Sequence, residues 1–314
     1  MSARAAAKRS LVVGSEGQDG YYLSELLRGR GDQVAGIARG GPDLRDRSRV
    51  GGLLADLRPA EIYYLAGVFG SSESAAEDPV AEFQRSSEVH VQGWLNFLDA
   101  VHREHRGTRL FYASSSRVFG NPVATPQNEA TAHAPLDIYG ITKSAGMQLG
   151  RFYRARGVHC SSGILYNHES PRRPAGFVSR KIVQAAVDIK LGARRSVTVG
   201  SLSIAVDWGA AQDYVEAMTR ILQLGQGSDF VIASGTQHTV QQLVEAAFAA
   251  VDLPWEPHVV EDRSLLKVPP RAQPLVGDSS RLREATGWRP RTTFAEMVRG
   301  MVDAELQSRQ PAPA

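Results

Sequence analysis

The stretch Ser10-Leu-Val-Val-Gly-Ser-Glu-Gly-Gln-Asp-Gly20 decides how this 314-residue chain folds. It joins a short apolar, β-branched run to glycines at every third position (Gly14, Gly17 and Gly20), and a helical pattern of apolar residues follows. A glycine turn between a strand and a helix allows a tight bend and lets backbone N–H groups approach a pyrophosphate at the helix N-terminus. The stretch therefore predicts the first βαβ unit of a dinucleotide-binding fold.

Beyond this unit, predicted strands alternate with predicted helices as far as residue 166. Such alternation indicates the α/β class, here a Rossmann doubly wound parallel sheet with helices on both faces. The second predicted strand ends near Ala38, and the chain between Arg39 and Asp43 is too short for another strand. We therefore expect the sheet to be short of one edge strand.

The chain changes in character after residue 166. A polar, proline-rich turn runs from Asn167 to Gly176, and the predicted elements beyond it are shorter and more interrupted. We therefore expect a dinucleotide-binding Rossmann domain over residues 1–166. Residues 167–314 are expected to form mainly a smaller α/β lobe that binds substrate, with some segments returning to the first domain.

Composition excludes several classes of function. The 36 basic and 33 acidic residues are interleaved, without the basic stripe that nucleic-acid binding requires. No apolar run approaches the roughly 18 residues that span a membrane. The single cysteine, Cys160, excludes an internal disulfide, indicates a reducing, cytoplasmic setting, and is expected to be a core residue. No metal site is expected, and His90, His102, His105 and His133 are interpreted as surface or capping residues.

The end of the second strand bears on the choice of cofactor. NAD-binding folds usually place an acidic residue there, where it holds the ribose hydroxyls. This strand instead ends Ile37-Ala38-Arg39. Because a guanidinium can pair with a 2′-phosphate, the sequence favours NADP, although NAD remains possible.

A second motif carries the chemistry. Tyr139 and Lys143 are four residues apart on a predicted helix, so both side chains lie on one face. A nearby lysine lowers the pKa of a phenol, and a poised tyrosine can take a hydroxyl proton as hydride leaves the same carbon. Ser114, Ser115 and Ser116 lie at the end of a predicted strand, where such sheets bind ligands, and a serine hydroxyl there can hold the substrate oxygen. Together these residues predict a dehydrogenase-type site.

Longer strings strengthen this interpretation. The chain resembles the extended short-chain dehydrogenase/reductase family, and within it the GDP-mannose 4,6-dehydratases and GDP-4-keto-6-deoxymannose reductases. The resemblance rests on Ile164-Leu-Tyr-Asn-His-Glu-Ser-Pro-Arg-Arg173, Phe177-Val-Ser-Arg-Lys-Ile182 and Asp207-Trp-Gly209, and it extends over almost the whole chain. It implies an NAD(P)-dependent enzyme that acts on a GDP-sugar and assembles as a homodimer or homotetramer.

The resemblance also implies roles for individual residues. Ser115, Tyr139 and Lys143 match the catalytic residues, and Asn167 and Lys181 match contacts to the sugar nucleotide. We further expect Ser116, Arg117 and Arg271 to contact the substrate. The expected cofactor-binding residues are Gly14, Gly17, Gln18, Asp19, Gly20, Arg39, Asp43, Leu44, Leu65, Ala66, Gly67, Tyr139, Lys143, His168 and Arg173.

One departure from the family pattern bears on the reaction. In the dehydratases a glutamate follows the strand-end serines and removes the proton from carbon 5 of the sugar. Here that position is Arg117, and a guanidinium cannot act as a general base because its pKa exceeds about 12. Dehydration would need another carboxylate, such as Glu73, Glu129 or Glu169. Substrate-side positions differ as well, because Val206 stands where the family has arginine.

Four functions remain open on this basis. The favoured one is an epimerase, which oxidises a ring hydroxyl and returns the same hydride, since this reaction needs no glutamate base. The second is a 4,6-dehydratase with a relocated base, and the third is a 4-keto sugar nucleotide reductase. The fourth is a non-catalytic protein that binds the ligand without turning it over.

Overall fold

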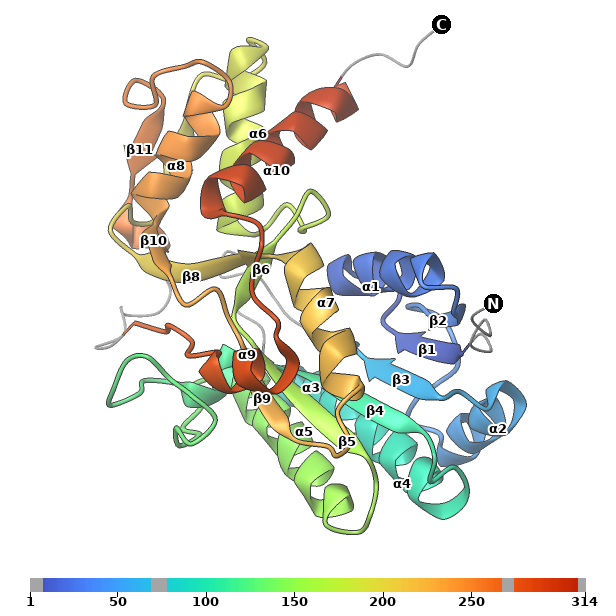
Figure 1. Ribbon diagram of the computed structural model, residues 1–314. Helices are drawn as coiled ribbons and strands as arrows, with labels where there is room; N and C mark the ends of the chain where they lie inside the picture. The colour runs from blue at the N-terminus through green and yellow to red at the C-terminus, as the bar shows by residue number, and fades with distance from the viewer. Residues whose placement is uncertain (1–7, 69–77, 267–273, 310–314) are drawn as a thin grey trace, which may run out of the picture.

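The computed structural model describes residues 8–68, 78–266 and 274–309. Its largest feature is a six-stranded sheet in the order β2-β1-β3-β4-β5-β9, in which all neighbouring strands are parallel (Figure 1). Parallel strands place all their carboxyl ends at one edge, where ligands bind in such folds. The strands are β1 (Arg9–Val13), β2 (Gln33–Ile37), β3 (Glu61–Tyr64), β4 (Arg109–Ser115), β5 (Cys160–Leu165) and β9 (Asp229–Ile232).

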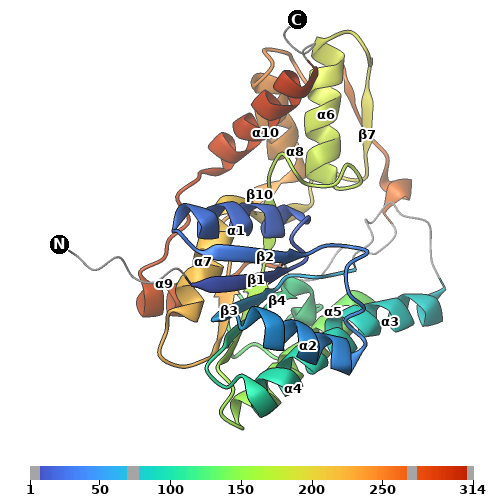
Figure 2. The ribbon, with the colours of Figure 1, turned by 90° about the vertical axis from the view of Figure 1, so that its right-hand side faces the viewer.

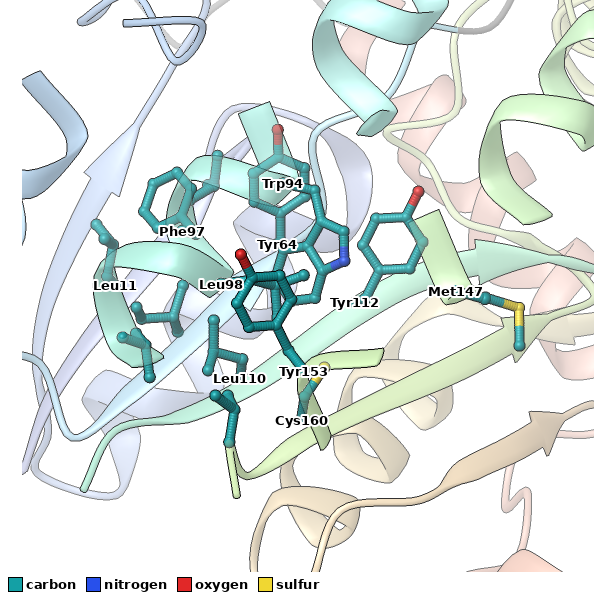
Figure 3. Packing of buried hydrophobic residues seen from close by; sticks show 14 of the residues in the cluster. Leu11, Tyr64, Trp94, Phe97, Leu98, Leu110, Tyr112, Met147, Tyr153 and Cys160 are labelled. Carbon is teal, nitrogen blue, oxygen red and sulfur yellow. The ribbon is translucent and has the colours of Figure 1, made fainter. Parts of the chain in front are cut away.

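Apolar side chains alternate along these strands and supply a core on each face of the sheet. Leu11 and Val13 pack on one face with Tyr64 and Trp94, as Figure 3 shows for part of this cluster, whereas Val12 packs on the other face. The first face is covered by α2 (Arg47–Leu57), α3 (Pro79–Ser87), α4 (Trp94–Glu104) and α5 (Ile138–Arg154), and the second by α1 (Gln18–Gly29), α7 (Ala211–Leu222) and α9 (Ser280–Thr286). The predicted doubly wound architecture is confirmed.

The expected loss of an edge strand is also confirmed. Dinucleotide-binding sheets of this type commonly carry a further strand outside the second one. In the described part of the chain, β2 is the outermost strand on its side, and the chain passes from β2 directly into α2. Asp46 caps α2 by accepting hydrogen bonds from the backbone N–H groups of Ser48 and Arg49.

Three helices from the C-terminal half form a second lobe, on the opposite side of the molecule from α2 and α4 (Figures 1 and 2). They are α6 (Val178–Lys190), α8 (Val240–Ala249) and α10 (Phe294–Arg309), and they share a separate hydrophobic core. Short strands flank them: β6 (Asn167–Glu169), β7 (Val197–Val199), β8 (Ala205–Ala210), β10 (Gln237–Thr239) and β11 (Val259–Glu261). A functional boundary at residue 166 stays a prediction.

An irregular turn joins the two helices that precede β4. A π-helical turn, Glu88–Gly93, connects α3 to α4. Single π turns insert an extra residue and often lie at functional sites. Short 3₁₀ turns occur at Ser116–Phe119 and Arg263–Leu265. None of the helices in the described ranges is long and apolar enough to cross a membrane.

Candidate active site at the carboxyl edge of the sheet

The glycine turn after β1 is packed too tightly to admit larger residues. Gly14 has a φ of +90°, and a Cβ atom there would lie 2.9 Å from the backbone nitrogen of Ala66. A Cβ on Gly20 would collide with the carbonyl oxygen of Gly14 and lie 2.7 Å from the Cα of Ser15. The turn therefore brings bare backbone to the start of α1, a surface that fits a pyrophosphate.

The first turn of α1 carries two polar residues that reach across to β6. Gly17 is the N-cap and offers no side chain to the helix N–H groups. Gln18 Nε2 donates to the carbonyl oxygen of His168 at 3.0 Å, and Ser170 Oγ donates to Gln18 Oε1 at 2.7 Å. The glycine turn is thus fixed to the chain segment that follows β5.

Asp19 and His168 form a buried ion pair at the same place. His168 Nε2 lies 2.9 Å from Asp19 Oδ2, and His168 Nδ1 lies 2.7 Å from the carbonyl oxygen of Tyr166. Two acceptors on the two ring nitrogens favour the doubly protonated ring. Asp19 accordingly raises the pKa of His168 against the opposing effect of burial, and His168 lowers the pKa of Asp19. The imidazole stacks on Tyr214 with 4.6 Å between ring centroids.

This pair predicts a pH-dependent contribution to stability. The contribution is complete between 3.8, the ordinary pKa of aspartate, and 6.5, the ordinary pKa of histidine. It is lost as the pH falls through the pKa of Asp19 and as it rises through the raised pKa of His168. We expect His168→Asn to lower the free energy of unfolding by about 3 kcal/mol at pH 5.5 and by less above pH 8. Urea unfolding across this range measures the difference, and His168→Gln, which keeps a donor for Asp19, is the control. A loss that does not change with pH would exclude the ion pair as its cause.

The two residues of the Y-x-x-x-K motif lie in the first turns of α5, next to β4. Asp137 caps the helix, because its Oδ1 accepts from the backbone N–H of Gly140 at 2.7 Å. Lys143 is 2% exposed and donates from Nζ to the carbonyl oxygen of Ala113 at 2.8 Å. Its Nζ lies 5.6 Å from the centre of the Tyr139 ring. The structure therefore brings the motif to the end of β4, as its helical spacing predicts.

Burial shifts the pKa values of both residues. It raises the pKa of Tyr139 to about 12, and the cations that lower it are Arg173 and Arg117. Burial also lowers the pKa of Lys143 to about 7. The sequence predicted that Lys143 lowers the pKa of this tyrosine, but burial raises that pKa overall, and the cations that oppose the rise are the two arginines. Lys143 is fixed mainly by its bond to the β4 backbone.

The three serines at the end of β4 lie in different environments. Ser114 is buried, and its Oγ has no hydrogen-bond partner among the residues that the structure describes. Ser115 is half-buried, and its Oγ accepts from the backbone N–H of Arg117 at 3.3 Å. Ser116 is 3% exposed, within the 3₁₀ turn. Ser115 is therefore the more accessible of the two serines that were proposed to meet the substrate.

Arg117 forms an ion pair that the sequence analysis did not predict. Its Nε donates to Asp137 Oδ2 at 2.8 Å, and its Nη2 donates to the same oxygen. Both oxygens of Asp137 are thus engaged, one by the guanidinium and one by the N-terminus of α5. Asp137 lies two residues before Tyr139, at a position typical of a helix cap, but the sequence contains no signal for its long-range partner.

Two carboxylates that were considered as a replacement base have other partners. Glu129 Oε1 accepts from the backbone N–H of Val231 at 2.7 Å. Glu169 is buried, and its Oε2 accepts from Ser179 Oγ and pairs with Arg173 at 3.2 Å. Glu73 lies outside the described residues.

His90 corrects the sequence analysis, which placed it on the surface. It is fully buried in the π-helical turn, and its ring meets that of Tyr139 edge to face, 5.3 Å apart. The backbone N–H of Val68 donates to its Nε2 at 3.0 Å, and its Nδ1 lies 2.8 Å from Thr142 Oγ1. The error has a physical reason: the sequence shows no companion residue near His90, because its partners Val68 and Thr142 lie 22 and 52 residues away.

The remaining predicted cofactor residues lie near the same edge of the sheet. Leu65, Ala66 and Gly67 follow β3, and Ala66 packs against Gly14. Asp43 forms an ion pair with Arg45, which lowers the pKa of its carboxyl to about 2. The carbonyl oxygen of Leu44 accepts a hydrogen bond from the side chain of Asn96, and Arg39 is exposed just beyond β2.

The structure describes some of the residues that were predicted to bind substrate. Asn167 is exposed at the start of β6, and Lys181 is half-buried on α6. Arg271 lies outside the described residues.

Cys160 is buried in β5, as expected of a core residue, and burial raises the pKa of its thiol to about 12. No cluster of three or more His, Cys, Asp or Glu suited to a metal ion occurs in the ranges that the structure describes.

Known proteins are similar to this chain in both sequence and fold. The family profile described as GDP-mannose 4,6 dehydratase matches residues 39–301. GDP-mannose 4,6 dehydratase 1 of Arabidopsis thaliana is 34% identical over an alignment that covers 96% of this chain and 90% of that protein. GDP-mannose 4,6-dehydratase of Vibrio cholerae is 31% identical, with 96% and 95% covered.

Two solved structures show the same fold. RMD from Pseudomonas aeruginosa, complexed with NADPH, has a TM-score of 0.83 at 23% identity, with 96% of this chain and all of that chain covered. UDP-glucose 4-epimerase of Thermus thermophilus, in complex with NAD, has a TM-score of 0.77 at 25% identity, with 95% and 98% covered.

Proposed function

Because the chain belongs to the GDP-mannose 4,6-dehydratase family of NAD(P)-dependent nucleotide-sugar enzymes, we propose that it oxidises a ring hydroxyl of a GDP-hexose and then dehydrates the sugar. The observation that carries this proposal is the Tyr139–Lys143 pair at the end of β4, beside the glycine turn. Epimerisation, which the sequence analysis favoured, becomes the second candidate, because the family relationship over almost the whole chain supports dehydration.

Each residue of the site has a part in this proposal. Gly14, Gly17 and Gly20 would hold the pyrophosphate, and Lys143 would hold the nicotinamide ribose. The nicotinamide, when bound, supplies the hydride acceptor. Tyr139 would take the proton from the substrate hydroxyl, with Ser115 holding the same oxygen. Dehydration would consume that proton at the departing hydroxyl or at carbon 5, whereas epimerisation would return it to the ring oxygen. The charges of Arg173 and Arg117 favour the phenolate that this step requires.

Arg117 is the specific observation that favours epimerisation as the second candidate. Asp137 holds its guanidinium beside Tyr139, where it stabilises negative charge but cannot remove a proton from carbon 5. Glu129 and Glu169 are engaged elsewhere. A dehydratase must therefore recruit one of these carboxylates when substrate binds, whereas an epimerase needs none of them.

The products distinguish the two candidates. Purified protein is incubated with GDP-mannose without added cofactor, and the nucleotide sugars are separated and weighed by mass spectrometry. We expect a product lighter by one water. A new peak of unchanged mass would favour epimerisation. A product that forms only with a keto sugar and added NADPH would contradict both candidates and indicate a reductase.

We propose NADP as the cofactor. Arg39 is exposed two residues beyond β2, and the carbonyl oxygen of Ile37 accepts from the backbone N–H groups of Gly14 and Ser15. The end of β2 thus lies beside the glycine turn, and a guanidinium that follows it can pair with a 2′-phosphate. NAD is the alternative, and the nucleotide extracted from the purified protein decides between them.

We further propose a homodimer or homotetramer of cytoplasmic enzyme. Helices α3 and α5 pack side by side and expose large apolar side chains: Val80 and Phe83 on α3, and Ile141 and Phe152 on α5. A second copy of the chain would cover these residues. Light scattering after gel filtration measures the assembly directly.

A further inference from the structure

Three segments of the site converge on His90, whose ring is buried: the loop after β3, α5 and β4. The backbone N–H of Val68 donates to Nε2 from the loop after β3, and Thr142 Oγ1 lies against Nδ1 from α5. The Tyr139 ring lies edge to face with the imidazole, and Tyr112 of β4 donates its hydroxyl to the carbonyl oxygen of His90 at 3.1 Å. A fully buried side chain with both nitrogens engaged holds its neighbours in one arrangement.

The hydrogen-bond donors and acceptors around the imidazole ring determine its protonation state. Because Val68 donates to Nε2, that nitrogen carries the lone pair, and Nδ1 carries the proton that points to Thr142. Burial and the charge of Lys143 keep the ring neutral by lowering the pKa of His90 to about 2. The Thr142 hydroxyl in turn lies 3.0 Å from the carbonyl oxygen of Ile138 and 3.1 Å from that of Tyr139. A chain of hydrogen bonds thus runs from Val68 through His90 to the backbone of the first turn of α5.

The loop of residues 65–68, at one end of these hydrogen bonds, lies between the glycine turn and the catalytic lysine. Ala66 packs against Gly14 of the glycine turn. A Cβ on Gly67 would lie 3.6 Å from both His90 Nε2 and Lys143 Nζ. The position of residues 65–68 therefore affects both the cofactor surface and the catalytic lysine.

We propose that His90 is a positioning residue, which ties the segment 65–68 to α5 and so sets how Tyr139 and Lys143 face the bound cofactor and sugar. The link to Val68 serves cofactor binding, and the link to Thr142 serves the turnover step. The role of the Thr142 link in turnover rests on the proposed function. The role of the Val68 link does not, since it concerns the cofactor surface alone.

Two substitutions separate the links because the amide groups of Asn and Gln overlay different ring nitrogens. His90→Asn can donate to Thr142 but cannot reach Val68, whereas His90→Gln can accept from Val68 but offers nothing to Thr142. His90→Phe fills the volume and removes both bonds. Thr142→Val removes the other partner of the turnover link. Thr219→Val is the matched control, since Thr219 is also buried, lies on α7, and donates its hydroxyl to the carbonyl oxygen of Glu216.

The measurements are the Kd for NADPH, from its fluorescence, and kcat and KM for the GDP-hexose that the protein turns over. We expect His90→Asn to weaken NADPH binding about tenfold with kcat nearly unchanged, the size expected for one lost hydrogen bond. We expect His90→Gln and Thr142→Val to lower kcat about tenfold with Kd and KM nearly unchanged. His90→Phe should show both losses, and Thr219→Val neither.

Two results would overturn the proposal. One is wild-type Kd and kcat in His90→Phe. The other is equal losses in His90→Asn and His90→Gln, which would make His90 a packing residue. If wild type turns over no GDP-hexose, the proposed function fails, but the NADPH affinities of His90→Asn and His90→Gln still test the Val68 link. Thermal unfolding of every variant identifies losses that come from misfolding.

Discussion

Replacing Tyr139 by phenylalanine is expected to lower kcat by about 100- to 10,000-fold, the range for loss of a general acid–base group. The substitution removes only the hydroxyl that would accept the proton of the substrate alcohol. The ring stays in place, against the buried ring of His90 and 5.6 Å from Lys143 Nζ. We therefore expect the affinities for cofactor and sugar nucleotide to change little. Single-turnover kinetics and equilibrium binding measure the two effects separately.

A second tyrosine provides the control. Tyr63 is also fully buried, and its hydroxyl donates to Glu61 Oε2 at 2.8 Å, on the other face of the sheet. Tyr63→Phe should cost stability and leave kcat unchanged. If Tyr139→Phe turned over as fast as Tyr63→Phe, Tyr139 would not be the proton acceptor.

Adding one methyl group to Gly20 is expected to weaken cofactor binding by more than about 100-fold. The new Cβ would collide with backbone atoms of Gly14 and Ser15, which cannot move away as a flexible side chain could. The turn must therefore open, and the backbone N–H groups at the start of α1 no longer converge on a pyrophosphate. Titration calorimetry with NADPH measures the loss.

The same helix supplies the matched control. A Cβ atom added to Gly29, at the other end of α1, would meet nothing from the rest of the described chain within 4 Å. Gly29→Ala should bind cofactor like wild type and be more stable by about 0.5–1 kcal/mol, because alanine has the higher helix propensity. Equal affinities in Gly20→Ala and Gly29→Ala would show that the glycine turn does not bind the cofactor.

The parts of the fold that depend on local pattern could be predicted from the sequence. The glycine turn determined the first strand and helix, and the short passage from Arg39 to Asp43 revealed the missing edge strand. The helical spacing of Tyr139 and Lys143 placed both beside β4. In each case, residues close together in the chain determine the geometry.

The contacts between distant segments could not be predicted in this way. Arg117 and Asp137 form their ion pair across 20 residues, and nothing local in either stretch reveals the partner. His90 was misplaced because its partners, Val68 and Thr142, lie 22 and 52 residues away in the chain. Strands β6, β8 and β10 are short and form a separate sheet, so their pairing depends on tertiary packing rather than on alternation of apolar residues.

The central claim is that the site withdraws hydrogen from a ring carbon of a GDP-hexose and returns it to the same molecule. The most direct test uses GDP-mannose carrying deuterium at carbon 4, incubated with the purified protein without added cofactor and followed by mass spectrometry. We expect the product to retain the deuterium, whether it has lost water or only changed configuration. A product without deuterium, or the absence of any turnover, would contradict it.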